Sequence, residues 1–102
     1  MAGERFAEVD EQQMPEIRLS ASAAIEYGRL NSRDQKKVNR ALSMIERSPL
    51  YYPGHIVPLK PPLAGLYRCR VGEWRIIYGL DKTSKAALVA AILKKDESTY
   101  RG

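Results

Sequence analysis

The chain has 102 residues, of which 44% are hydrophobic and 28% are charged, and this composition is typical of one globular domain rather than of a disordered segment. No apolar run approaches the roughly 18 residues that a membrane span needs, so we expect no membrane partner. Seventeen Lys and Arg against twelve Asp and Glu give a net charge of +5, while a single cysteine and a single histidine exclude an internal disulfide and a zinc site built from Cys and His.

The charge is distributed unevenly along the chain. Residues 1–14 carry one base against four acids, a net charge of −3, so the remaining residues carry +8. The first 14 residues also lack the apolar core of a secretion signal. We therefore expect a flexible acidic leader over residues 1–14 and a single basic domain over residues 15–102, located in the reducing cytoplasm. A domain this basic favours an anionic partner, either a nucleic acid or an acidic protein.

The first half of the domain reads as one strand and two helices. The alternation of polar and apolar residues over Glu16–Leu19 predicts a short strand. Ser20 is a suitable N-cap for a helix over residues 21–30. Ser32 and Gln35 have the spacing of a capping box, which predicts a second helix from there to about Ser48. Its apolar residues follow the spacing of one buried stripe, namely Val38, Ala41, Leu42 and Ile45.

The second half reads as a loop followed by strands. Residues 50–66 are rich in Pro and Gly, which predicts a loop. Strands are then predicted over residues 66–71, 74–80 and 86–93, and the last run is apolar throughout, as in a central strand covered on both faces. The predicted fold class is therefore α+β: an N-terminal strand, a helical hairpin, and an antiparallel three-stranded meander that forms a curved sheet with the helices on one face.

Gly72-Glu73 fits a two-residue hairpin turn, and this turn would pair Arg70 with Arg75. Because side chains alternate along a strand, one face of the hairpin is apolar and aromatic and suits packing against the helices. Its residues are Tyr67, Cys69, Val71, Trp74, Ile76 and Tyr78. The opposite face then presents Arg68, Arg70 and Arg75.

Three guanidinium groups this close repel one another, and the face would be stabilised by an anion. The planar fork of arginine binds phosphate oxygens in pairs, so the face predicts a clamp for a nucleic-acid backbone or for a phosphorane-like transition state. The alternative is a solvated face neutralised by Glu73, Asp81 or the acids of the tail. A one-residue bulge at the turn would move Arg75 to the other face.

Other chemically active residues give weaker signals. The phenol of Tyr100 could bind a phosphate, stack on a base or transfer a proton, or it could only attach the tail to the sheet. Lys94 and Lys95 could extend the basic face or simply end a strand in solvent. We interpret His55 as an ordinary loop residue, because no carboxylate is spaced to orient it, and Cys69 as a core residue. No motif for a metal or a nucleotide cofactor is present, so we expect neither.

Residues 66–78, LYRCRVGEWRIIY, strongly resemble the Y-R-x-R-V-G-[DE]-[YW]-R-[IV]-[IV]-Y block of the RelE/ParE toxin superfamily. Leu59-Lys60 and Gly65 resemble its K-L-x-G approach, and the ending from Lys94 to Tyr100 resembles its basic-then-Tyr C-terminus. The resemblance covers about residues 15–102. It implies a toxin of a type II toxin–antitoxin system with a small microbial RNase-like fold and a cognate antitoxin as partner.

RelE-type members of this superfamily cut mRNA in the ribosomal A site without a metal, and the resemblance implies the same activity here. The 2′-hydroxyl of the RNA displaces the downstream 5′-oxygen, while positive side chains stabilise the transition state. Matched by motif position, the implied catalytic residues are Arg68, Arg70, Arg75 and Tyr100. The implied RNA- or phosphate-binding residues are Lys60, Lys94 and Lys95, and the partners are the ribosome and mRNA.

Two departures from the family pattern keep a second interpretation open. Arg68 and Arg70 stand where well-known RelE-type toxins have lysine, and arginine cannot exchange protons, so these residues suit charge stabilisation rather than acid–base work. Asp96 and Glu97 interrupt the basic tail. Both departures favour a ParE-type inhibitor of DNA gyrase without nuclease activity. A third possibility is an inactive member that only binds its antitoxin.

Overall fold

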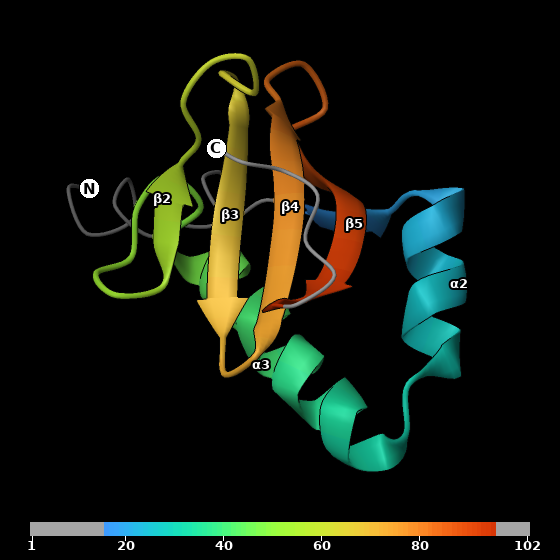
Figure 1. Ribbon diagram of the computed structural model, residues 1–102. Coiled ribbons are helices and arrows are strands. Elements are labelled where there is room, and N and C mark those ends of the chain that lie inside the picture. The colour runs from blue at the N-terminus through green and yellow to red at the C-terminus, as the bar shows by residue number, and fades with distance from the viewer. Residues whose placement is uncertain (1–15, 96–102) are drawn as a thin grey trace, which may run out of the picture.

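The computed structural model describes residues 16–95, which form a five-stranded sheet and two helices (Figure 1). The predicted acidic leader and Tyr100 lie outside the described residues. The strand order is β1-β5-β4-β3-β2, with β1 parallel to β5 and the other neighbours antiparallel. In chain order the elements are β1 (Glu16–Leu19), α2 (Ala21–Arg29), α3 (Ser32–Arg47), β2 (Ile56–Pro58), β3 (Leu66–Val71), β4 (Trp74–Asp81) and β5 (Ala86–Lys94). The predicted α+β class is confirmed.

The two helices begin at side-chain caps. The hydroxyl of Ser20 accepts a hydrogen bond from the Ala23 N–H at 3.0 Å and caps α2, as predicted. The cap of α3 is Asn31, whose side-chain oxygen accepts from the Asp34 N–H at 2.8 Å, so the capping box expected at Ser32 is wrong. Asn31 has the extended backbone that a cap requires, whereas Ser32 is already helical. Gln35 instead donates through its side chain to the Tyr27 carbonyl and ties the two helices together.

Both helices pack on the same face of the sheet. In Figure 1, α3 passes behind β3 and β4 while α2 stands beside β5. The predicted stripe of α3 meets the predicted apolar face of the hairpin in one continuous core. Of the stripe, Val38, Ala41 and Ile45 are fully buried and Leu42 is half-buried. Neither helix is long and apolar enough to cross a membrane.

Two details of the sheet differ from the sequence prediction. The predicted loop contains a short edge strand, β2, which pairs antiparallel with β3. Its last residue is Pro58, which an edge strand tolerates because the N–H that proline lacks would face away from β3. The apolar strand β5 does lie inside the sheet, but only one of its faces is covered along the middle. Val89 is fully buried while Leu88 is 42% exposed, because both helices occupy the same side.

Candidate functional site

The hairpin of β3 and β4 has the predicted register. Gly72 in the turn has a φ of 58°, which favours glycine. Arg70 pairs with Arg75, and Arg68 pairs with Ile77. The register shift of β4 lies between Ile77 and Tyr78, in its pairing with β5, and so does not affect the turn. Arg68, Arg70 and Arg75 therefore belong to one face of the sheet, opposite the helices, and we call this the arginine face.

Backbone carbonyls hold the two directly opposed arginines apart. Arg75 is only 9% exposed, and its Nη1 donates to the carbonyls of Gly72 at 2.9 Å and Trp74 at 3.0 Å. Arg70 is exposed, and its Nη2 donates to the carbonyl of Gly54 at 3.3 Å. These contacts draw the two guanidinium groups toward the turn and toward the loop before β2. They reduce the like-charge repulsion and leave further N–H donors on each group for an anion.

Acidic side chains do not neutralise this face within residues 16–95. The ion pairs in this part of the chain join Arg18 to Glu16 and Arg29 to Glu26. Neither Glu73 nor Asp81 lies within 4.0 Å of the three guanidinium groups. The Asp81 carboxylate instead accepts hydrogen bonds from the Ser84 hydroxyl and the Thr83 N–H. These two bonds, that from Ser84 more strongly, lower the pKa of Asp81. The buried Nε of Arg68 has no hydrogen-bond partner among the described residues. Within the described residues, the positive charge of this face therefore has no carboxylate partner.

The candidate lysines lie in different places. Lys94 pairs with Trp74, and its Nζ is 5.7 Å from the centre of the Trp74 ring, so it lies on the helix side of the sheet. The residue of β5 that pairs with Arg75 is Leu93 and not Lys94. Lys95 is exposed just after β5, and its backbone N–H bonds to the Glu73 carbonyl beside the hairpin turn.

Lys60 is exposed in the loop between β2 and β3. This loop precedes the first residue of β3, Leu66, and the four residue steps from Leu66 to Arg70 span about 13 Å. The structure therefore brings the three arginines together and leaves Lys60 at the far end of the strand.

A residue that the sequence interpretation set aside, His55, lies directly against Arg70. Its Nδ1 is 2.7 Å from the Arg70 carbonyl oxygen, and the Arg70 N–H donates to the His55 carbonyl at 2.8 Å. The centres of the Tyr52 and His55 rings are 5.6 Å apart, and the two rings are nearly perpendicular. The only sequence signal for this contact was a histidine immediately before a short apolar run, because the strand that carries it to β3 was not predicted.

Cys69 lies on the helix side of β3 and is fully buried, which confirms its prediction as a core residue. Burial raises the pKa of its thiol to about 12, and the nearby Arg68 charge offsets only part of that shift. The thiol is therefore neutral at ordinary pH and is not a nucleophile there.

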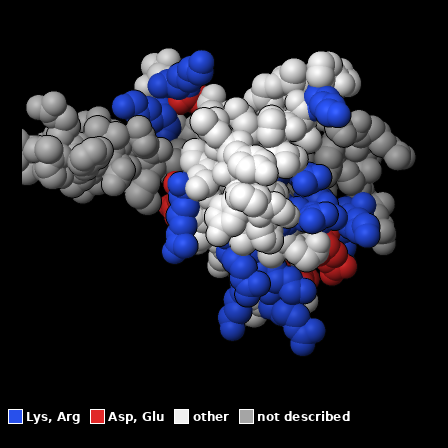
Figure 2. All heavy atoms as spheres, turned by 90° about the vertical axis from the view of Figure 1, so that its left-hand side faces the viewer, with Lys and Arg blue, Asp and Glu red and all other residues white. Residues whose placement is uncertain are grey.

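Seen from the β2 edge, basic side chains surround an uncharged centre. Figure 2 shows Lys and Arg side chains at the bottom, along the right and at the upper left of this view, with few Asp or Glu side chains among them. Such an arrangement attracts an anionic partner at long range.

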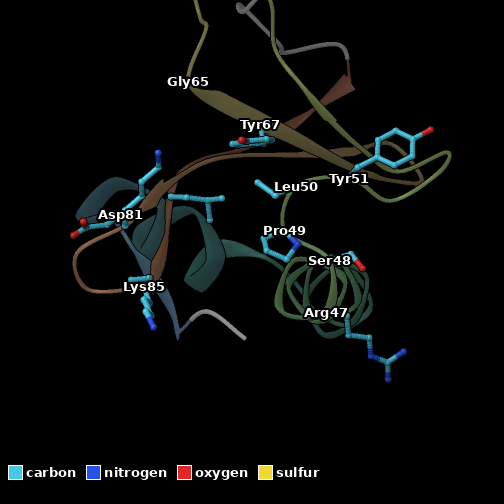
Figure 3. Close-up of a pocket in the computed structure, with 12 residues that line it drawn as sticks. Arg47, Ser48, Pro49, Leu50, Tyr51, Gly65, Tyr67, Asp81 and Lys85 are labelled. Carbon is cyan, nitrogen blue, oxygen red and sulfur yellow. The ribbon is translucent and has the colours of Figure 1, made fainter. Parts of the chain in front are cut away.

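A second feature, an apolar groove, lies on the helix side of the sheet. It has a volume of about 910 Å³ and runs between the segment after α3, the start of β3 and the turn between β4 and β5. In Figure 3, Pro49 and Leu50 lie between Tyr67 and the end of α3. Leu50 and Tyr51 are each 59% exposed, which is unusual for large apolar side chains. Basic residues also line the groove, namely Arg47, Lys82 and Lys85, against a single acid, Asp81.

Comparison with known proteins finds relatives among solved structures. No family model and no curated protein matches the chain. The YoeB–YefM complex of Staphylococcus aureus matches with 27% identity and a TM-score of 0.63, covering 84% of this chain and 98% of that one. The YoeB/ParE toxin of Agrobacterium tumefaciens has 23% identity and a TM-score of 0.67, and the RelBE2 toxin–antitoxin complex of Mycobacterium tuberculosis has 23% identity and a TM-score of 0.66. Each of these two matches covers 78% of this chain and 96% of the other.

The protein therefore has the fold of the RelE/ParE toxin superfamily, and the superfamily that its sequence resembles is confirmed. Its structural relatives are toxins of toxin–antitoxin systems, several of them solved together with their antitoxins.

Proposed function

We propose that this protein is the toxin of a type II toxin–antitoxin system and that it cleaves mRNA on the ribosome in the cytoplasm without a metal. The observation that carries the proposal is the arginine face, which gathers three guanidinium groups and has no carboxylate partner within the described residues. The fold shared with RelE and YoeB toxins supports the same activity.

The proposed reaction is an attack of the RNA's 2′-hydroxyl on the adjacent phosphorus. A bond from the 2′-oxygen to phosphorus forms, and the bond from phosphorus to the downstream 5′-oxygen breaks. Negative charge builds on the phosphoryl oxygens, and preorganised cations lower the barrier most when they are aimed at that charge. Arg70 is the exposed member of the set and is positioned to contact the phosphate, while Arg75 contributes charge from a fixed, mostly buried position. Tyr100 is proposed to protonate the leaving oxygen.

Primer extension on a defined mRNA in a purified translation system tests this function. Wild-type protein should produce cuts only when ribosomes are present. Arg70→Gln keeps a polar side chain of similar length but removes the charge, and it should reduce the single-turnover rate about a hundredfold or more. Arg29→Gln is the matched control, because Arg29 is an exposed α2 residue that pairs with Glu26.

Intact message with and without ribosomes would contradict the proposed activity. Supercoiling by purified DNA gyrase would then be measured with the same protein, because arginine in place of lysine at residues 68 and 70 favours the ParE-type alternative. Inhibited supercoiling would establish the gyrase interpretation.

The proposed partner is a cognate antitoxin, and the apolar groove suits it. A segment with apolar anchors would cover Leu50 and Tyr51, and acidic residues beside those anchors would meet Arg47, Lys82 and Lys85. An amphipathic acidic helix has both features.

A further inference from the structure

We propose that His55 is the general base that removes the proton from the attacking 2′-hydroxyl, an inference that rests on the proposed ribonuclease function. The arginine face supplies charge but no proton acceptor, since arginine stays protonated at any working pH. His55 is the chain's only histidine, and its imidazole, which has a nitrogen able to accept a proton, lies beside Arg70.

A hydrogen bond fixes which nitrogen of the ring can act. The partner of Nδ1 is a carbonyl oxygen, which only accepts, so Nδ1 must carry the hydrogen. In the neutral ring the lone pair then resides on Nε2, the nitrogen directed away from the strand. The edge-on contact with Tyr52 holds the ring on its other side. A general base needs this arrangement, in which one nitrogen is anchored and the other is free to take a proton.

The base is adjacent to the phosphate-binding group. The Arg70 guanidinium donates to the carbonyl of Gly54, the residue next to His55, so both side chains lie at the same loop. A phosphate held by the remaining donors of Arg70 would place the neighbouring 2′-hydroxyl at the loop that carries His55. Productive attack then needs the 2′-oxygen and the phosphorus about 3–3.5 Å apart.

The 2′-hydroxyl proton moves to Nε2 of His55, the 2′-oxygen bonds to phosphorus, and the 5′-oxygen leaves with the electron pair of the broken bond and accepts a proton from an acid. The resulting imidazolium would lie beside Arg70, with Arg68 and Arg75 farther along the same sheet face and Tyr52 as the other contact.

His55→Asn separates the hydrogen bond that His55 donates to Arg70 from its proposed role as a base. The Asn amide can still donate to the Arg70 carbonyl, but it cannot accept a proton, so we expect unchanged urea unfolding and a single-turnover rate at least a hundredfold lower. The concentration giving half-maximal cleavage should not change.

A His55→Asn protein that keeps the wild-type rate would overturn the assignment while leaving the nuclease proposal intact. Uncut message with the wild-type protein, with and without ribosomes, would instead remove the nuclease proposal and the base assignment together. His55→Ala, which loses both the base and the anchoring donor, should be no faster than His55→Asn; a faster alanine variant would also overturn the assignment.

Discussion

At the scale of single residues, the two opposed arginines have different surroundings although they share one face. Arg75 is mostly buried and bonds to the carbonyls of the turn, whereas Arg70 is exposed with a single carbonyl contact. Substitution of Arg75 therefore changes the stability of the fold as well as the charge of the arginine face. Substitution of Arg70 changes mainly the charge of that face.

We expect Arg75→Ala to lower the free energy of unfolding by about 1–3 kcal/mol, because it removes the side-chain donor to the Gly72 and Trp74 carbonyls. Arg70→Ala should change stability by no more than about 0.5 kcal/mol, because its side chain is exposed. Urea unfolding followed by Trp74 fluorescence measures both changes. Equal losses in the two variants would show that the turn contacts of Arg75 contribute nothing.

Cys69 gives a prediction about pH. Its pKa is raised from an ordinary 9.0 to about 12 by burial, so the folded protein favours the neutral thiol. The stabilisation from burying that thiol is complete below about pH 9 and declines as the pH rises from 9 toward 12. Unfolding free energies of the wild type should fall faster over this range than those of Cys69→Ala. Parallel pH curves for the two proteins would contradict the assignment.

At the scale of elements, the start of α3 depends on a residue outside the expected capping box. Asn31→Ala should cost about 0.5–2 kcal/mol, because the Asp34 N–H loses its acceptor. Ser32→Ala should cost less, because Ser32 is the first helical residue and alanine is a good helix former. Urea unfolding compares the two. A larger loss for Ser32 would restore the capping box.

The hairpin and the helices are joined through Trp74. Trp74 is 5% exposed, its Nε1 donates to the Asp34 carboxylate at 3.4 Å, and Lys94 lies over its ring. We expect Trp74→Ala to cost about 3–5 kcal/mol in unfolding free energy. Trp74→Phe should cost clearly less, since it keeps most of the apolar volume. Circular dichroism during urea unfolding reports both values, and an unaffected alanine variant would be incompatible with this packing.

At the scale of the whole molecule, the sheet separates two surfaces. The arginine face lies on the side away from the helices, and the apolar groove lies on the helix side near the far ends of β3 and β4. The proposed catalysis and the proposed antitoxin binding should therefore respond to different substitutions.

Leu50→Asp places a charge at an exposed apolar position of the groove, so we expect at least tenfold weaker binding of the cognate antitoxin with little loss of stability. Cleavage of ribosome-bound mRNA should be unchanged. Arg70→Gln should show the opposite pattern, and calorimetry with the antitoxin together with primer extension measures both. Loss of cleavage in Leu50→Asp, or unchanged antitoxin affinity, would contradict the separation of the two surfaces.

Sequence patterns between residues close in the chain predicted much of this fold. Alternation, capping residues and the Gly72-Glu73 turn predicted four of the strands and both helices, and the period of two placed Arg68, Arg70 and Arg75 on one face. These features depend on contacts between residues close in the chain, which a sequence pattern records directly.

The tertiary structure decided what depends on residues distant in the chain. Only the pairing of the short strand β2 with β3 brings His55 to Arg70, and three residues ending in proline carry too little periodicity to predict that pairing. The parallel pairing of β1 with β5, the packing of Lys94 on Trp74 and the groove at Leu50 likewise arise between distant segments. Such contacts form because separate apolar surfaces are buried together, and that burial is a property of the assembled fold rather than of any one segment.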